Sequence, residues 1–169
     1  MDETRVAGRR FGVTADTHDA LVDWPKLKAT LENAWGKVDG VIHCGDITSM
    51  TALNDLGALG PVYATRSDGD PPASPPALCN GPRVLTIGGV RIGLTFALPD
   101  EAKTADGAAR LFGGPVAVCI YGGTHEAHVG QDEGMGYVNP GSPSLARQRT
   151  TAVLTIEGGR ASVEIVDLP

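Results

Sequence analysis

The stretch FGVTADTHD, which spans residues 11–19, decides the fold of this chain. It begins with an apolar run over 11–15 and becomes polar from Asp16 onward. Such a run is typical of a buried strand that carries a loop to the edge of a sheet. Residues two apart on extended backbone point to the same side, so Asp16 and His18 can face one point. The stretch therefore predicts a strand that ends in a pair of candidate ligands.

Downstream of this strand, helices and strands are predicted to alternate. Pro25 suits the first turn of one helix, and Ser49 suits the N-cap of a second helix. The run over 40–44 is short and apolar, as in a strand buried on both faces. This alternation predicts a parallel sheet with right-handed crossovers. The predicted elements are a helix over 25–35, a strand over 40–44, a helix over 50–56 and a strand over 61–65.

The second half of the chain has a different pattern. The segment Pro71–Pro76 cannot join a central strand. Gly88-Gly89 and Gly158-Gly159 each lie between two apolar runs and predict hairpins. Two packed mixed sheets with helices outside, in one domain over 1–169, would accommodate both halves. The predicted elements are strands over 83–87, 90–96, 116–121, 137–139, 152–156 and 161–166, and a helix over 100–112.

Composition narrows the class of protein. The chain has 169 residues, a formal net charge of -6 and three cysteines. An acidic chain gains little from the phosphate backbone, so no nucleic-acid partner is expected. Cys44 and Cys119 lie in apolar runs, which predicts buried thiols in a reducing compartment. Because the sequence lacks a signal-peptide core and a membrane-spanning run, we expect a cytoplasmic protein without membrane contact.

Three polar segments fall at the ends of predicted strands, where ligands collect in α/β sheets. They are Asp16-Thr17-His18, Gly45-Asp46 and Gly122-Gly123-Thr124-His125. Carboxylates with imidazoles suit zinc, manganese or iron better than magnesium or calcium. Each segment alone is more often a turn or a cap, and His43 fits a core histidine better than a ligand. Their conjunction, in a chain with only four histidines, favours a metal site.

Together with Asn139-Pro140-Gly141-Ser142, these segments form an ordered set of motifs. The set resembles the calcineurin-like metallophosphoesterases, in particular the small single-domain branch that contains bacterial phosphodiesterases and the metallophosphoesterase-like subunit of the retromer coat. The resemblance runs from about Phe11 to Val166. It implies an α/β fold, a four-layer α-β-β-α sandwich of two mixed sheets flanked by helices.

The resemblance also implies a set of site residues. Family members hold two metal ions bridged by an aspartate, which matches Asp46. The ligands of the first ion match Asp16, His18, Asp46 and His125, so one divalent ion (Mn, Zn, Fe or Ni) is expected. Catalytic roles fall on Asp46, Asp68 and His125.

The second metal site is degenerate in this sequence. Its asparagine appears as Asp68, and its two histidines are replaced by Phe96 and Gly123. Asp70, Glu126, His128 and Arg66 could in principle compensate, but capping and surface roles suit them better. A second ion would therefore be held weakly.

Three functions remain open from the sequence. The first is a metal-dependent phosphoesterase that hydrolyses phosphodiesters or small phosphomonoesters with a metal-activated water. Its activity should be weak, because a dinuclear site clamps the attacking and leaving oxygens and one half of that site is missing. The second is a non-catalytic scaffold of the same fold, with a protein partner. The third is a degenerate hydrolase that uses one ion only for stability. The substrate and the oligomeric state do not follow from the sequence.

Overall fold

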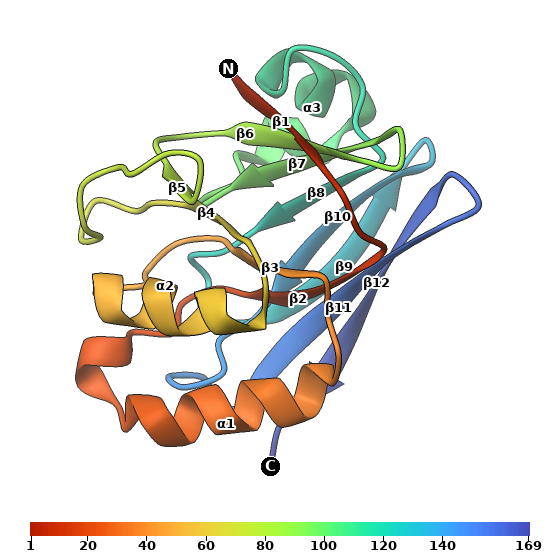
Figure 1. The fold of residues 1–169 in the computed structure, drawn as a ribbon. Coiled ribbons are helices and arrows are strands. Elements are labelled where there is room, and N and C mark those ends of the chain that lie inside the picture. The colour runs from red at the N-terminus through yellow and green to blue at the C-terminus, as the bar shows by residue number, and fades with distance from the viewer.

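A computed structural model describes all residues, 1–169, and contains two mixed six-stranded sheets (Figure 1). Sheet A has the order β1 (Asp2–Val6), β6 (Arg83–Ile87), β7 (Val90–Thr95), β8 (Val118–Tyr121), β10 (Met135–Pro140) and β9 (Ala127–Asp132). Sheet B has the order β12 (Arg160–Asp167), β11 (Thr150–Glu157), β2 (Arg10–Thr14), β3 (Gly40–His43), β4 (Val62–Thr65) and β5 (Leu78–Cys79). The strands β2 to β5 are parallel, whereas β11 runs antiparallel to both β2 and β12.

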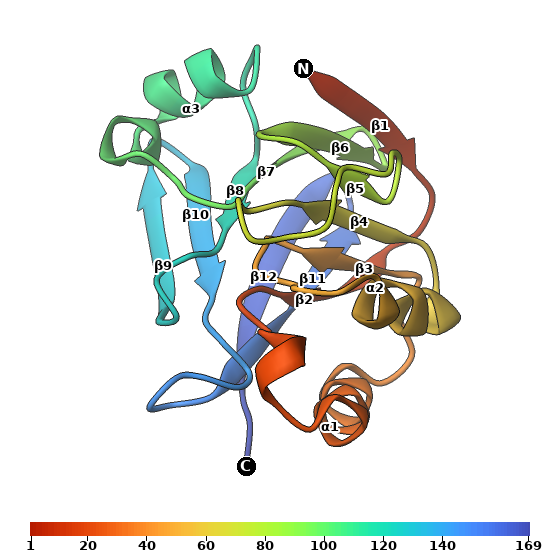
Figure 2. The ribbon, with the colours of Figure 1, turned by 90° about the vertical axis from the view of Figure 1, so that its left-hand side faces the viewer.

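Three α-helices cover the outer faces of the sheets: α1 (Trp24–Trp35), α2 (Met50–Leu56) and α3 (Ala105–Leu111). Figures 1 and 2 show α1 and α2 on the side of sheet B and α3 on the opposite side, over sheet A. Short 3₁₀ turns span Asp19–Leu21, Gly57–Leu59 and Asp100–Lys103. The predicted α-β-β-α sandwich is confirmed. None of the helices has the length and apolar character needed to cross a membrane.

The alternation of side chains along each strand builds the layers. In β3, Ile42 joins the core between the two sheets, whereas its neighbour Val41 packs under α1 and α2. Gly12 of β2 lies under Trp35, because a Cβ at Gly12 would lie 2.3 Å from Trp35 Cδ2. Strands buried on both faces read as continuous apolar runs, which is why they were predictable from the sequence.

Most predicted elements lie within one or two residues of the observed ones. The N-cap prediction for α2 is confirmed, because Ser49 Oγ accepts a hydrogen bond from Ala52 N (3.3 Å). The prediction of buried thiols is confirmed for Cys44 and Cys119, which are both fully buried.

The helix predicted over 100–112 is wrong as one continuous element. The chain forms a 3₁₀ turn over Asp100–Lys103, and α3 begins only after Thr104. Thr104 has extended backbone, and its Oγ1 accepts a hydrogen bond from Gly107 N (3.1 Å), so it caps a new helix.

Three edge strands were not predicted, and one of them is the two-residue strand β5, which pairs with β4 at the edge of sheet B. β1 pairs with β6, and Asp2 at its start forms an ion pair with Arg83 Nη2 (2.8 Å). β9 pairs with β10 at the other edge of sheet A and is largely exposed.

Candidate metal centre

Four side chains from both sheets meet at the carboxyl ends of β2, β3 and β8. Asp16 and His18 follow β2, Asp46 follows β3, and His125 follows β8. One ligand atom of each residue lies within 4.8 Å of the ligand atoms of the other three. The loops after β2 and β3 meet because these strands are parallel neighbours in sheet B, and the loop after β8 joins them from sheet A.

Individual distances define the cluster, as we call these four residues from here on. His18 Nε2 lies 3.2 Å from His125 Nε2 and 3.4 Å from Asp46 Oδ2. His125 Nε2 lies 3.7 Å from Asp16 Oδ1. Two ligand atoms bonded to one tetrahedral zinc ion at about 2.1 Å are separated by about 3.4 Å. The observed spacings therefore fit a single ion of this kind.

One buried atom in the cluster has no partner. Asp16 is fully buried, and its Oδ1 makes no hydrogen bond, whereas its Oδ2 accepts one from Gly123 N (2.9 Å). A buried carboxylate oxygen without a donor is costly in a folded chain. A cation held by the cluster would satisfy it. The donor set, two carboxylates and two imidazoles, suits a divalent first-row metal.

All four cluster residues have positive backbone φ angles, between 44° and 64°. The expectation that Asp16 and His18 would converge from extended backbone is therefore wrong, because both adopt left-handed conformations. Aspartate and histidine tolerate this region better than most residues, and such strained positions gather at functional sites. The left-handed turns bend each loop sharply at its ligand.

Backbone hydrogen bonds join the two ligand loops of sheet B. Asp16 N donates to Gly45 O (2.9 Å), and His18 N donates to Asp46 O (3.0 Å). The two loops thus continue the pairing of β2 and β3 beyond the strand ends. This pairing fixes the position of Asp46 relative to Asp16.

Asp70 anchors the loop that follows Asp46, in agreement with the capping role expected for it. Its Oδ1 accepts hydrogen bonds from Ile47 N (2.9 Å) and Thr48 N (3.1 Å), and its Oδ2 accepts one from Ser67 N (2.9 Å). Ser67 Oγ in turn donates to Asp46 Oδ1. One buried carboxylate therefore connects the loop after β4 to the cluster.

Serines after β10 hold the first ligand loop. Ser142 Oγ donates to Asp16 O (2.7 Å), and Ser144 Oγ donates to Thr17 O (2.8 Å). Asn139 Nδ2 donates to Thr124 Oγ1 (3.0 Å), next to His125. Sequence reasoning used Asn139 and Ser142 only as parts of a motif and did not identify these positioning roles.

His43 is a buried core residue, as expected. Its Nε2 lies 2.9 Å from Thr17 Oγ1, inside the first ligand loop. Burial lowers the pKa of His43 from 6.5 to about 4, so the ring is neutral in the folded chain near neutral pH.

Burial also raises the pKa of Asp16 to about 6, and the hydrogen bond from Gly123 N partly offsets this. Positive charge beside Asp16 would favour its ionised form.

The resemblance matches Phe96 to a ligand position of the second metal site. A Cβ added to Gly45 would lie 2.3 Å from Phe96 Cδ2, and one added to Gly123 would lie 3.4 Å from Phe96 Cζ. The ring therefore lies against the backbones of both loops that carry Asp46 and His125. It offers no ligand atom there.

Asp68, for which a catalytic role was expected, does not join the cluster. It is exposed and forms no hydrogen bond or ion pair. Arg66 forms no surface salt bridge; its guanidinium donates to Pro71 O (2.9 Å) and Asp70 O (2.9 Å) and closes the loop over 66–71. Glu126 and His128 are exposed, as expected.

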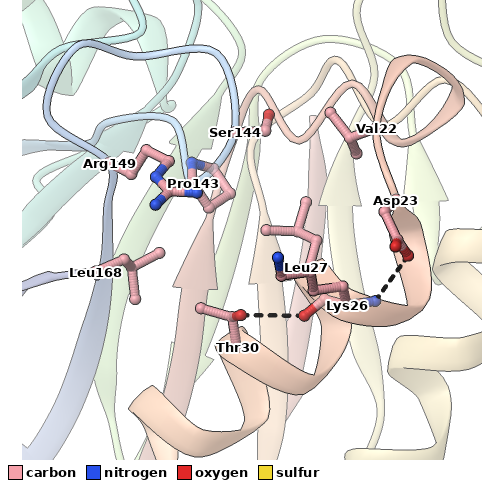
Figure 3. A pocket seen from close by; sticks show the side chains of 9 residues that line it. All are labelled: Val22, Asp23, Lys26, Leu27, Thr30, Pro143, Ser144, Arg149 and Leu168. Atoms are coloured by element: carbon pink, nitrogen blue, oxygen red, sulfur yellow. Dashed lines mark hydrogen bonds between the residues drawn. The ribbon is translucent and has the colours of Figure 1, made fainter.

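Two pockets flank the loop over 141–149. A pocket of about 540 Å³ is lined by His125 of the cluster and by residues of this loop. A smaller pocket of about 170 Å³ lies between the loop and α1, and none of the cluster residues lines it (Figure 3). There Asp23 accepts a hydrogen bond from Lys26 N, and Thr30 Oγ1 donates to Lys26 O. The larger pocket is thus the one in contact with the cluster.

Comparisons with known proteins agree with this geometry. Residues 10–159 match the family model of the calcineurin-like phosphoesterase superfamily domain. A probable metallophosphoesterase of Methanocaldococcus jannaschii is 31% identical over 148 residues, which cover 81% of this chain and 69% of the relative. An archaeal phosphodiesterase structure superposes with a TM-score of 0.70 at 23% identity and covers 93% of this chain and 99% of its own. Vps29 from Entamoeba histolytica, complexed with Zn²⁺, superposes with a TM-score of 0.68 at 21% identity, over 94% of this chain and 98% of its own.

Proposed function

Because this chain belongs to the calcineurin-like phosphoesterase superfamily, we propose that it is a metal-dependent phosphoesterase that hydrolyses phosphodiesters or small phosphomonoesters. The observation that carries the proposal is the unpartnered, buried Asp16 Oδ1 beside three further metal-ligand side chains. Such an arrangement is costly without a cation, and a bound cation can stabilise the charge that develops in phosphoester hydrolysis.

Asp16, His18, Asp46 and His125 would hold one divalent ion. A bound ion of this kind supplies a Lewis acid that polarises a phosphoryl oxygen and lowers the pKa of a water molecule. Manganese, zinc, iron and nickel all suit the donor set. The chain's own contribution is to hold both carboxylates in place through Gly123 N and Ser67 Oγ.

We propose weak activity, because Phe96 fills the half of the site where a second ion would neutralise charge in the transition state. Losing one stabilising donor can cost about 10²–10³ in rate. Asp68, though exposed, is the one proposed catalytic residue that stands outside the cluster, and its role rests on the resemblance alone. A cytoplasmic location fits the three free, buried cysteines.

The test is hydrolysis of bis-p-nitrophenyl phosphate by the manganese-loaded protein. His125→Ala removes a cluster imidazole, and His128→Ala serves as the matched control because His128 is exposed and outside the cluster. We expect turnover by the native chain and by His128→Ala, and its loss in His125→Ala. Turnover that is equal in all three proteins would overturn the proposal.

A second candidate function is a non-catalytic scaffold of the same fold. Phe96 and Gly123, in place of ligand residues, favour it, and structures of Vps29 are among those that this chain resembles. The same assay separates the two. Metal binding that depends on His125, without turnover above that of His125→Ala, would favour the scaffold.

A further inference from the structure

A pocket of about 540 Å³ opens directly beside His125. It lies between the start of β9, the loop that joins β10 to β11, and the end of β12, and Figure 2 shows this loop crossing beneath the start of β9 and the end of β10. Its volume lies within the range of about 300–1,000 Å³ that small-molecule sites occupy. Because His125 belongs both to the cluster and to the pocket lining, an organic group attached to a phosphate at the cluster can reach this pocket.

The floor of the pocket is apolar. Leu145 is 44% exposed and is one of few large hydrophobic side chains that face solvent. Ile165, Ala146 and Ala127 complete this floor. An exposed apolar surface of this kind beside a polar centre is typical of a ligand site.

The rim of the pocket is polar and of mixed charge. Arg147 is exposed and forms no hydrogen bond or ion pair within the chain. Asp167 accepts a hydrogen bond from Gln148 (3.4 Å), and Glu126 is exposed. With one free cation against two carboxylates, the rim does not concentrate a second phosphate group. It offers donors and acceptors for hydroxyl groups, and the planar guanidinium can stack on a flat ring.

We propose that this pocket binds the organic group of a phosphodiester and selects a neutral, hydroxyl-bearing group with a flat ring, such as a nucleoside. The proposal rests on the proposed phosphoesterase function and adds the substrate class to it. It makes Ala146 and Arg147 specificity-determining residues, because they lie in the pocket and outside the cluster.

The experiment compares two diesters with the manganese-loaded protein: the p-nitrophenyl ester of thymidine 5′-phosphate and methyl p-nitrophenyl phosphate. We expect kcat/KM to be at least about tenfold higher for the nucleoside diester, since contacts of this size discriminate by one to two powers of ten. Ala146→Trp fills the pocket and should remove this preference. Ala58→Trp, at an exposed position on the 3₁₀ turn after α2, is the matched control.

Arg147→Gln provides a second variant that removes no intramolecular contact, with Arg160→Gln as its matched control. It should lower the preference severalfold, and melting curves should show both variants folded. A preference below twofold in the native chain, or one unchanged in Ala146→Trp, would overturn the proposal.

If neither diester is hydrolysed, the phosphoesterase function fails, and ligand-observed NMR with thymidine then decides the pocket separately. Saturation transfer to thymidine that is lost in Ala146→Trp but kept in Ala58→Trp would support the pocket as a nucleoside-like site. Absence of transfer in the native chain would reject it.

Discussion

The ring of Phe96 lies against the backbone of Gly45, so close that a Cβ at Gly45 would lie 2.3 Å from Phe96 Cδ2. Gly45 precedes the cluster ligand Asp46, and it has a φ of 96°, which favours glycine. An apolar ring thus lies against the residue before Asp46, and the resemblance matches this ring to a ligand of a second ion.

Replacing this ring should restore part of a second metal site. We expect Phe96→His combined with Gly123→His to raise bound manganese from about one to about two ions per chain, and hydrolysis of bis-p-nitrophenyl phosphate by about tenfold to a hundredfold. Gly123 has a φ of 94°, so a histidine there is strained and some stability is lost. Elemental analysis and initial rates measure the two effects.

Phe96→Leu is the control for this experiment, since leucine removes the ring but adds no ligand atom. It should leave both metal content and rate near the native values. A double histidine variant that stays folded and still binds a single ion would show that the second half-site is closed for another reason.

Metal removal should destabilise the chain. Without a cation, the buried carboxylate of Asp16 faces the carboxylate of Asp46 across the cluster, and repulsion by Asp46 contributes to the raised pKa of Asp16. Manganese at about 100 times its dissociation constant would stabilise the fold by about 2.7 kcal/mol. For a chain of this size that corresponds to about 5–10 °C in Tm. Differential scanning calorimetry with and without chelator measures it, and His125→Ala should show a much smaller shift.

Alanine substitution at Asp70 and at Asp68 should change the unfolding free energy by very different amounts, although the two residues lie only two positions apart. Asp70 is buried and accepts hydrogen bonds from Ile47 N, Thr48 N and Ser67 N. Asp70→Ala leaves these donors unpaired and should cost about 3 kcal/mol or more of unfolding free energy.

Asp68→Ala is the matched control, because Asp68 is exposed and without contacts. Its stability should change by less than about 0.5 kcal/mol. Urea unfolding of both variants gives the comparison. The rate of Asp68→Ala also tests the catalytic role proposed for Asp68; an unchanged rate would remove that residue from the site.

The parts of the fold that the sequence predicted are those with apolar runs buried on both faces. The run over 40–44 is an example, since Val41 and Ile42 pack into different cores and both must be apolar. β1 and β9 escaped prediction because they are edge strands whose polar, exposed residues carry no such signal. β5 escaped it because a strand of two residues is too short to show a pattern. The register of edge strands depends on partners distant in sequence, such as Arg83 for Asp2.

The sequence was sufficient to predict which residues form the candidate site. It was not sufficient to predict their backbone conformations or the hydrogen bonds that hold them. Parallel neighbours deliver their carboxyl ends to one edge of a sheet, so Asp16 after β2 and Asp46 after β3 were expected to meet, whereas His125 follows β8 of the other sheet and its membership came from the motif set. Their left-handed backbone angles follow from hydrogen bonds between loops, such as Asp16 N to Gly45 O, which no local pattern encodes. The hydrogen bond from Ser67 Oγ to Asp46 Oδ1 also joins two loops that are distant in sequence, so no local pattern predicts it either.

His43 should make the fold sensitive to acid. Burial lowers the pKa of this ring from 6.5 to about 4, while Asp70 opposes the shift and His18 adds to it. The unfolded chain therefore binds a proton that the folded chain does not, so this contribution to stability is complete above about pH 6.5 and is lost as the pH falls toward 4. Between about pH 7 and about pH 5 the loss should be about 2 kcal/mol.

His43→Gln does not titrate and can keep a hydrogen bond to Thr17 Oγ1, so it should lose about 2 kcal/mol less than the native chain over the same range. Urea unfolding in chelator measures both proteins, and the opposing titration of Asp16, whose pKa is raised, is common to them and cancels in the difference. Parallel stability curves for the two proteins would contradict a neutral, buried His43.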